Sequence, residues 1–144
     1  MAKISSAEWE VMRVLWTKGE TTSTEITKIL STKQDWSAST VKTLLGRLAD
    51  KGYLTSRREG RTYLYQAVLN EEEANLTAVQ EVLNKICLTK HHHLLGKLIQ
   101  QTPMTKEQIK DLQEILASKE SVEQVQCDCQ PGQCHCVSHV EEIK

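Results

Sequence analysis

Residues 37–68 read SASTVKTLLGRLADKGYLTSRREGRTYLYQAV, and the spacing of the apolar residues changes within this stretch. In its first half they recur every three or four positions, which predicts an amphipathic helix. They are Val41, Leu44, Leu45 and Leu48. In residues 53–68 the period falls to two on both sides of Glu59-Gly60, which predicts a β-hairpin.

Two further helices are expected before this stretch. Ser5 and Glu8 have the spacing of a capping box, and the apolar residues that follow recur at helical intervals. Thr22 and Glu25 repeat the capping pattern ahead of a shorter helix. Three helices followed by a hairpin within about 65 residues is the order of a winged helix-turn-helix. We therefore expect a DNA-binding domain over residues 1–70.

The rest of the chain predicts more helices and then a polar tail. Asn70, followed by three glutamates, is a favourable helix start, and Thr105 with Gln108 caps another helix. Helices of this size cannot bury their apolar faces alone, so we expect them to pack on a second copy, or alternatively on the N-terminal domain. The expected fold is mainly α with a small hairpin, with a dimerisation region at 71–120 and a metal-binding tail at 121–144.

Charge is distributed unequally along the chain. Residues 1–70 carry eleven Lys and Arg against seven Asp and Glu, a net charge of +4, and the remainder carries −5. A basic N-terminal half suits a polyanionic partner, although ordinary solvated surface can produce the same difference. No apolar run approaches the roughly 18 residues of a membrane span. Because the N-terminus lacks a secretory signal pattern, we expect a soluble cytoplasmic protein without a membrane partner, and reduced cysteines.

Four of the five cysteines lie in the ten residues CDCQPGQCHC, 127–136. A disulfide within a C-x-C pair would close a strained ring, and a reducing compartment disfavours one between the pairs. Pro131-Gly132 supplies a turn that can bring the second pair back over the first. Soft thiolates favour Zn²⁺ or Cu⁺, and the tight C-x-C step tilts the choice toward Cu⁺ as one native ligand. The expected metal ligands are Cys127, Cys129, Cys134 and Cys136.

Other metal-ligating residue types have simpler interpretations. His135 and His139 lie in or beside the cluster and can replace a sulfur, but solvated tail residues are the favoured interpretation. The three consecutive histidines at residues 91–93 cannot easily share one ion, because consecutive helical residues face different directions. Cys87 is expected on the apolar side of a helix, as a buried, inert thiol.

Two separate parts of the chain resemble one family. Residues 6–16, 40–48 and 59–65 look like the winged-helix domain of the penicillinase repressor family, BlaI and MecI. The C-x-C-x4-C-x-C tail is similar to that of the copper-responsive CopY branch of this family.

The resemblance implies a homodimer that binds an inverted-repeat operator ahead of copper-export genes. It also implies Zn²⁺ on the thiolates in the DNA-binding state and release of DNA when Cu⁺ displaces it, with a copper chaperone as one Cu⁺ donor. The β-lactam branch is typically switched by cleavage at an Asn-Phe bond. This chain contains no Phe, which argues against that switch.

The residues expected to contact double-stranded DNA lie on the third helix and the hairpin. A recognition helix enters the major groove, so its polar face should reach bases or phosphates, and the hairpin cations should reach phosphates or the minor groove. The alternative is a basic solvated surface. The expected residues are Thr40, Lys42, Thr43 and Arg47 on the helix, with Arg57, Arg58 and Arg61 on the hairpin.

Three other function classes compete with a copper-responsive repressor. A zinc- or cadmium-responsive repressor would use the same scaffold. A thiolate copper buffer or chaperone would use the tail but would not need a basic recognition helix. An enzyme is not expected, because the sequence lacks an evident Ser/His/Asp set, phosphate loop or pair of catalytic carboxylates.

Overall fold

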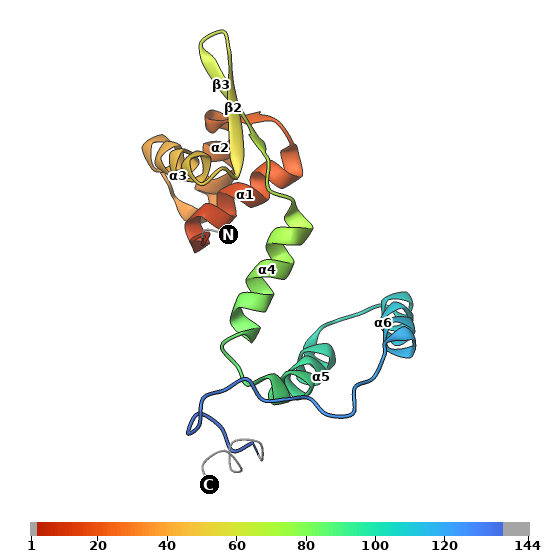
Figure 1. Ribbon diagram of the computed structural model, residues 1–144. Helices are drawn as coiled ribbons and strands as arrows, with labels where there is room; N and C mark the ends of the chain where they lie inside the picture. Colours follow the sequence, from red (N-terminus) through yellow and green to blue (C-terminus); the bar gives the residue numbers. More distant parts are fainter. Residues whose placement is uncertain (1–2, 137–144) are drawn as a thin grey trace. The chain divides into compact units, whose positions relative to one another are not determined.

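The computed structural model describes residues 3–136 (Figure 1). The chain forms two compact units, Met1–Leu76 and Thr77–Lys144. The elements of the first unit are α1 (Ser6–Lys18), β1 (Thr21–Thr22), α2 (Ser23–Gln34), α3 (Ala38–Asp50), β2 (Leu54–Glu59) and β3 (Thr62–Ala67). The elements that follow are α4 (Glu71–Leu83), η1 (Leu88–Lys90), α5 (His91–Gln101) and α6 (Lys106–Ser118).

The first two helices begin where their capping residues predict. Ser5 Oγ accepts a hydrogen bond from the Glu8 amide at 3.1 Å, and Glu8 Oε1 accepts one from the Ser5 amide at 3.3 Å. Thr22 Oγ1 accepts one from the Glu25 amide at 3.2 Å. Side chains therefore satisfy backbone donors that have no partner within either helix, and the predicted capping is confirmed.

The hairpin belongs to a three-stranded antiparallel sheet with the order β1-β3-β2. The register of β2 on β3 pairs Leu54 with Ala67 and ends with Glu59 opposite Thr62. Gly60 has a φ of 63° at the first central position of the two-residue turn, where a type II′ turn favours glycine. The third strand was not predicted, because β1 has only two residues and shows no period. The mainly helical winged-helix fold is confirmed.

The three helices and the start of the hairpin enclose one hydrophobic core. The predicted apolar face of α3 points into it, and each of its four residues is at most 5% exposed. Trp16 and Trp36 pack at the edge of this core, and Trp16 Nε1 donates a hydrogen bond to the Leu69 carbonyl at 2.9 Å. The core residues are Val11, Met12, Val14, Leu15, Ile26, Leu30, Val41, Leu44, Leu45, Leu48, Tyr53 and Leu54.

An ion pair with a buried carboxylate joins the beginning of α1 to the end of α3. Lys51 Nζ lies 2.7 Å from Glu8 Oε2 and 2.9 Å from Glu8 Oε1, and it also donates to the Lys3 carbonyl at 2.8 Å. The Glu8 side chain is only 4% exposed. Burial opposes its ionisation, but the hydrogen bonds from Lys51 and Ser5 prevail and lower the pKa of Glu8. The pair thus fixes the end of α3 against the beginning of α1.

Two helices after the hairpin, α4 and α6, also begin as predicted. Asn70 Oδ1 accepts from the Glu73 amide at 3.0 Å, and Thr105 and Gln108 form a capping box. The apolar side chains of α4, α5 and α6 are largely exposed on the single chain. These side chains are Leu76, Val79 and Val82 on α4, Leu95, Leu98 and Ile99 on α5, and Ile109, Ile115 and Leu116 on α6.

Among residues 3–136, no helix has the length and apolar character needed to cross a membrane.

Candidate DNA-binding face and candidate metal centre

The outer face of α3 presents polar and basic side chains to solvent. Thr40, Lys42, Thr43 and Arg47 are all exposed, because the intervening apolar residues face the core. Thr43 Oγ1 donates to the Ser39 carbonyl at 3.0 Å. Within the described chain, Lys42 and Arg47 form no ion pair. Both cationic heads are therefore available to phosphates or base edges.

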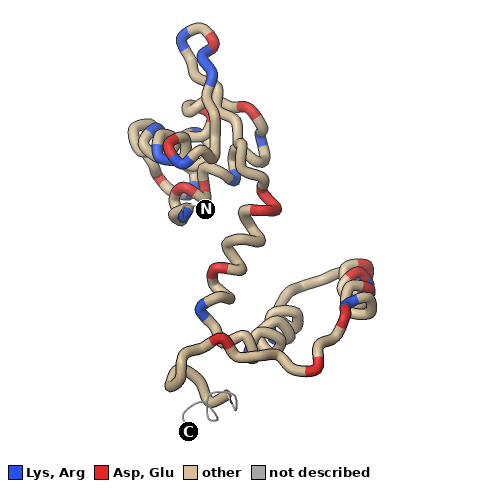
Figure 2. Tube along the Cα trace, in the orientation of Figure 1, with Lys and Arg blue, Asp and Glu red and all other residues tan. Residues whose placement is uncertain are grey.

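The hairpin carries the second group of predicted cations. Figure 2 shows Lys and Arg positions on both the hairpin and α3. Arg58 Nε donates to the Gly60 carbonyl at 3.1 Å, and Arg61 is exposed in the turn itself. The structure therefore places both arginines at the tip of the hairpin, where an approaching phosphate can reach them.

Arg57 has an acidic partner that the sequence did not reveal. Its Nε donates to Glu20 Oε2 at 3.1 Å, and its Nη2 donates to Glu20 Oε1. A third contact, 3.4 Å long, joins it to Glu59 Oε2. The hydrogen bonding between Arg57 and Glu20 lowers the pKa of Glu20 and raises that of Arg57. Arg57 is thus already neutralised, unlike Lys42 and Arg47 on α3.

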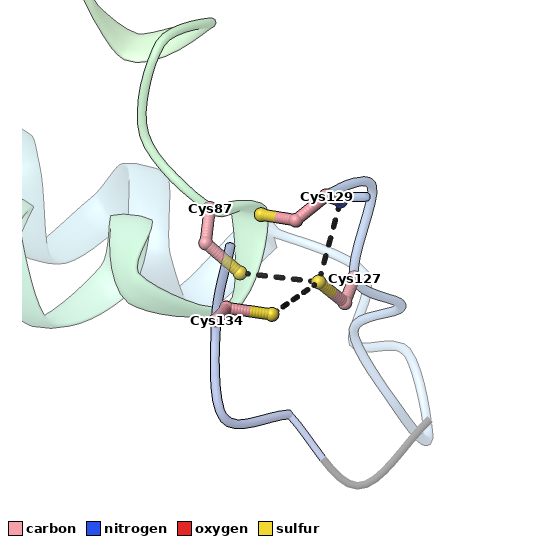
Figure 3. Close-up of side chains that lie close together, drawn as sticks. All are labelled: Cys87, Cys127, Cys129 and Cys134. Atoms are coloured by element: carbon pink, nitrogen blue, oxygen red, sulfur yellow. Dashed lines mark hydrogen bonds between the residues drawn. The ribbon is translucent and has the colours of Figure 1, made fainter. Parts of the chain in front are cut away.

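Four cysteine side chains converge on one point in the second unit. The sulfurs of Cys87, Cys127, Cys129 and Cys134 all lie within 4.8 Å of one another (Figure 3). Cys127 Sγ is 3.4 Å from Cys87 Sγ and 3.2 Å from Cys134 Sγ. The arrangement can hold one metal ion among four sulfur ligands.

The tail reverses direction at the predicted turn. The Gln133 amide donates to the Gln130 carbonyl at 3.0 Å, and Gly132 between them has a φ of 94°, a conformation that favours glycine. Before the turn, the Cys129 amide donates a hydrogen bond to Cys127 Sγ at 3.4 Å. The second cysteine pair therefore returns toward the first, as the sequence predicted.

The structure corrects the interpretation of Cys87. This residue is buried, as predicted, but it lies between α4 and η1 and not on a helix. Its sulfur faces three tail cysteines, so the thiol is not an isolated apolar side chain. Its separation from the tail by forty residues gave no spacing motif. The one available signal was the presence of a fifth cysteine in a chain whose other four are clustered.

Cys136 occupies a neighbouring position. Its sulfur is 3.5 Å from Cys87 Sγ and 3.2 Å from Thr89 Oγ1. Thr89 Oγ1 also lies 3.0 Å from Cys87 Sγ, so the hydroxyl bridges the two sulfurs. All five cysteines therefore gather in one place, with Cys136 beside the group of four.

The distances suit a tetrahedral thiolate site. Zn–S bonds of about 2.3 Å place the sulfurs of a tetrahedron about 3.8 Å apart, within the range spanned by the cysteine sulfurs. An all-sulfur donor set also suits Cu⁺ and is unfavourable for Mg²⁺ or Ca²⁺. The residues thus fit the soft metals that the sequence predicted.

The thiols differ in acidity. The Thr89 hydrogen bond, acting against burial, lowers the pKa of Cys87 to about 6, whereas burial raises the pKa of Cys129 to about 11 and that of Cys127 as well. Metal binding must displace protons from the thiols whose pKa is raised, Cys127 and Cys129 among them.

Among the described residues, no histidine belongs to the group of converging ligand atoms. His91 Nε2 lies 2.9 Å from both the Leu83 and Ile86 carbonyls, so a proton on Nε2 bonds the end of α4 to the start of α5. His135 is exposed. His139 lies outside the described residues.

Comparison with known proteins places these features in a family context. The family model described as "Penicillinase repressor" matches residues 4–118. An uncharacterized protein of Latilactobacillus sakei is 40% identical over 93% of each chain. The penicillinase repressor of Bacillus licheniformis is 31% identical over 79% of this chain and 89% of its own. The methicillin resistance regulatory protein MecI of Mammaliicoccus sciuri is 27% identical over 81% of this chain and 95% of its own.

Two solved structures are also similar to parts of the chain. The DNA-binding domain of the repressor BlaI is 39% identical, with a TM-score of 0.46 over 51% of this chain and 93% of that domain. The CopR repressor structure is 42% identical, with a TM-score of 0.41 over 48% of this chain and all of the other.

Proposed function

Because the chain belongs to the penicillinase repressor family, we propose that its cysteine cluster makes it a copper-responsive repressor of copper-export genes. A repressor of this family binds operator DNA and is not an enzyme. In our proposal, a zinc-loaded homodimer holds an inverted-repeat operator in the cytoplasm, and Cu⁺ displaces the zinc and releases the DNA. The convergence of four cysteine sulfurs within 4.8 Å carries this proposal.

DNA recognition is assigned to α3 and the hairpin. With α3 in the major groove, Lys42 and Arg47 reach guanine edges or phosphates, and Thr40 and Thr43 contact phosphates or thymine methyls. Arg58 and Arg61 contact the flanking backbone, because they lie at the hairpin tip. The exposure of these side chains supports the assignment.

Homodimer formation is assigned to the helices after the hairpin. The single chain leaves apolar side chains exposed on α4, α5 and α6, including Val79 at 53% and Leu116 at 64%. A second copy offers the same faces and can cover them through a two-fold interface. Two recognition helices related by that symmetry would match the two halves of an inverted repeat.

Cysteine thiolates supply the soft ligands for both metals. One Zn²⁺ on four thiolates leaves a charge of −2, and so do two Cu⁺ on the same four. Electrostatic repulsion of DNA therefore does not distinguish the two forms. We infer that the signal is geometric, because Cu⁺ prefers two or three sulfurs where Zn²⁺ takes four.

The coupling free energy required between metal binding and DNA binding is modest. A metal that lowers operator affinity about 100-fold must bind the DNA-free protein about 2.7 kcal/mol more favourably than the DNA-bound protein. Binding of structural zinc to thiolate sites releases about 10–16 kcal/mol, so a fraction of the metal-binding energy suffices.

Operator binding by anaerobic protein, loaded in turn with Zn²⁺, Cu⁺ and Cd²⁺, tests the proposal. Fluorescence anisotropy on an inverted-repeat duplex over a salt series gives both affinity and the number of phosphate contacts. We expect the Zn²⁺ form to bind and the Cu⁺ form to bind about 100-fold less tightly, with similar salt slopes.

Other outcomes identify the competing functions. Release by Cd²⁺ or excess Zn²⁺ without release by Cu⁺ would indicate a zinc or cadmium sensor. Copper binding with no change in operator affinity would indicate a thiolate buffer. A shallower salt slope in the Cu⁺ form would replace the geometric signal with an electrostatic one.

A further inference from the structure

We propose that Cys87, and not Cys136, is the fourth ligand of the zinc-loaded site, so that the ion fastens the C-terminal tail to the connection between α4 and α5. The inference deepens the proposed function and rests on it for the presence of a soft metal. With Cys87 as a ligand, the metal site is not confined to the tail but links two segments that are distant in the sequence.

The sulfur positions carry this assignment. The set whose sulfurs all lie within 4.8 Å of one another contains Cys87 and three tail cysteines. Figure 3 shows the Cys87 side chain approaching from the segment after α4, while the other three come from the tail. Cys136 is not a member of this set, although its sulfur lies 3.5 Å from Cys87 Sγ and also interacts with Cys127 and Cys134. Cys136 is therefore a fifth sulfur beside the site.

The backbone around Cys87 is held independently of any metal. The His91 ring bonds the Leu83 and Ile86 carbonyls, which bracket the turn before Cys87. Thr89 Oγ1 contacts the Cys87 sulfur directly. A ligand supported in this way is better placed for coordination than a ligand on a loose chain.

A second contact docks the tail at the same segment without using sulfur. The Leu88 amide donates to Asp128 Oδ1 at 3.2 Å, and Asp128 lies between the two cysteines of the first pair. This bond supplies a side-chain acceptor at the start of η1, whose own N-cap residue, Cys87, provides none. The tail therefore meets the α4–α5 connection through both a carboxylate and thiols.

The consequence is a closed loop that contains two helices. The 39 residues between Cys87 and Cys127 include α5 and α6. A bond through the ion restrains both ends of this loop. A change in coordination at the sulfurs therefore acts directly on the chain that leads into α5, which a tail-only site would not do.

Thiol footprinting of the full-length protein tests the assignment. Zinc-loaded and chelator-treated samples are alkylated under anaerobic conditions, and mass spectrometry of peptides reports each cysteine separately. We expect zinc to slow alkylation of Cys87, Cys127, Cys129 and Cys134 at least tenfold. Protection of the tail cysteines with Cys87 reacting at its metal-free rate would overturn the inference alone. Protection of none would overturn the inference and the proposed metal switch together.

Matched variants give a second, independent measure. Competition with a chromophoric chelator should show zinc bound at least about tenfold more weakly by Cys87→Ser, and less than about threefold more weakly by Cys136→Ser. If zinc protects all five cysteines in the footprinting experiment, the assignment still requires a larger loss of zinc affinity in Cys87→Ser than in Cys136→Ser. A larger loss in Cys136→Ser than in Cys87→Ser would contradict the assignment. Circular dichroism of both variants checks that the helices remain formed.

Discussion

Arg57 Nε donates to Glu20 Oε2 at 3.1 Å, which joins strand β2 to the residue that precedes β1. The second hydrogen bond, from Nη2 to Glu20 Oε1, makes the pair bidentate. A carboxylate thus neutralises one of the three hairpin arginines and adds a negative charge near a surface proposed to meet phosphates. Family membership alone does not reveal this local neutralisation of charge.

Replacing Glu20 with Gln should strengthen operator binding about threefold at low salt. The change removes a charge that repels phosphate and frees Arg57, so the salt dependence should steepen by up to about 0.9 if Arg57 gains a phosphate contact. Anisotropy over a salt series measures both effects. Glu10→Gln on α1 makes the same charge change as a control, and equal effects of the two variants would rule out a specific role for the Arg57 pair.

Replacing Arg47 with Ala should weaken operator binding about tenfold without destabilising the fold. The side chain is exposed on the face of α3 opposite the core, so truncation removes a DNA contact worth about 1–3 kcal/mol and leaves no cavity. Arg13→Ala is the matched control, because its side chain is 61% exposed on α1. Unchanged affinity in Arg47→Ala would exclude this part of the recognition face.

Replacing Glu8 with Gln should lower the free energy of unfolding by about 1–3 kcal/mol at neutral pH, because Lys51 loses a buried partner. The folded-state pKa of Glu8 lies below its ordinary value of 4.5. Its contribution is therefore fully present above pH 4.5 and is lost as the pH falls through the lower folded-state value. Urea unfolding across this range measures the difference. A constant gap between the two proteins down to pH 2 would contradict the ion-pair explanation.

Replacing Gly132 with Ala should weaken zinc binding about five- to thirtyfold. No atom lies within 4 Å of an added Cβ, so the cost arises from the positive φ and amounts to roughly 1–2 kcal/mol. Gly96→Ala in α5 is the control, since its surroundings are also open and its φ is ordinary. Chelator competition measures both variants, and wild-type affinity in Gly132→Ala would show that the turn does not shape the site.

The sequence predicted the winged-helix unit well because local rules agree there. Ser5 and Thr22 cap the expected helices, and the apolar residues of α3 enter the core. Strand β1 was not predicted, because two residues show no periodicity and because its pairing with Tyr65 and Leu64 depends on tertiary contacts. The ion pair of Arg57 with Glu20 was not predicted for the same reason, since its partners lie 37 positions apart in the sequence.

The sulfur cluster was predicted in part. Four cysteines in ten residues and the Pro131-Gly132 turn were enough to predict convergence of the tail. The predicted position of Cys87 on a helix was wrong, because the prediction extended the helical spacing of Leu83 and Ile86 past the end of α4. The contribution of Cys87 depends on the chain folding back across forty residues, which no spacing rule describes.

A titration of the zinc-loaded repressor–operator complex with Cu⁺, under anaerobic conditions, tests metal control of DNA binding most directly. Operator anisotropy and zinc release to a chromophoric chelator are recorded on the same sample. We predict that both signals change together with one midpoint, because displacement of zinc from the sulfurs is the event that frees the DNA. Complete zinc release with the operator still bound, or operator release with zinc retained, would contradict the account.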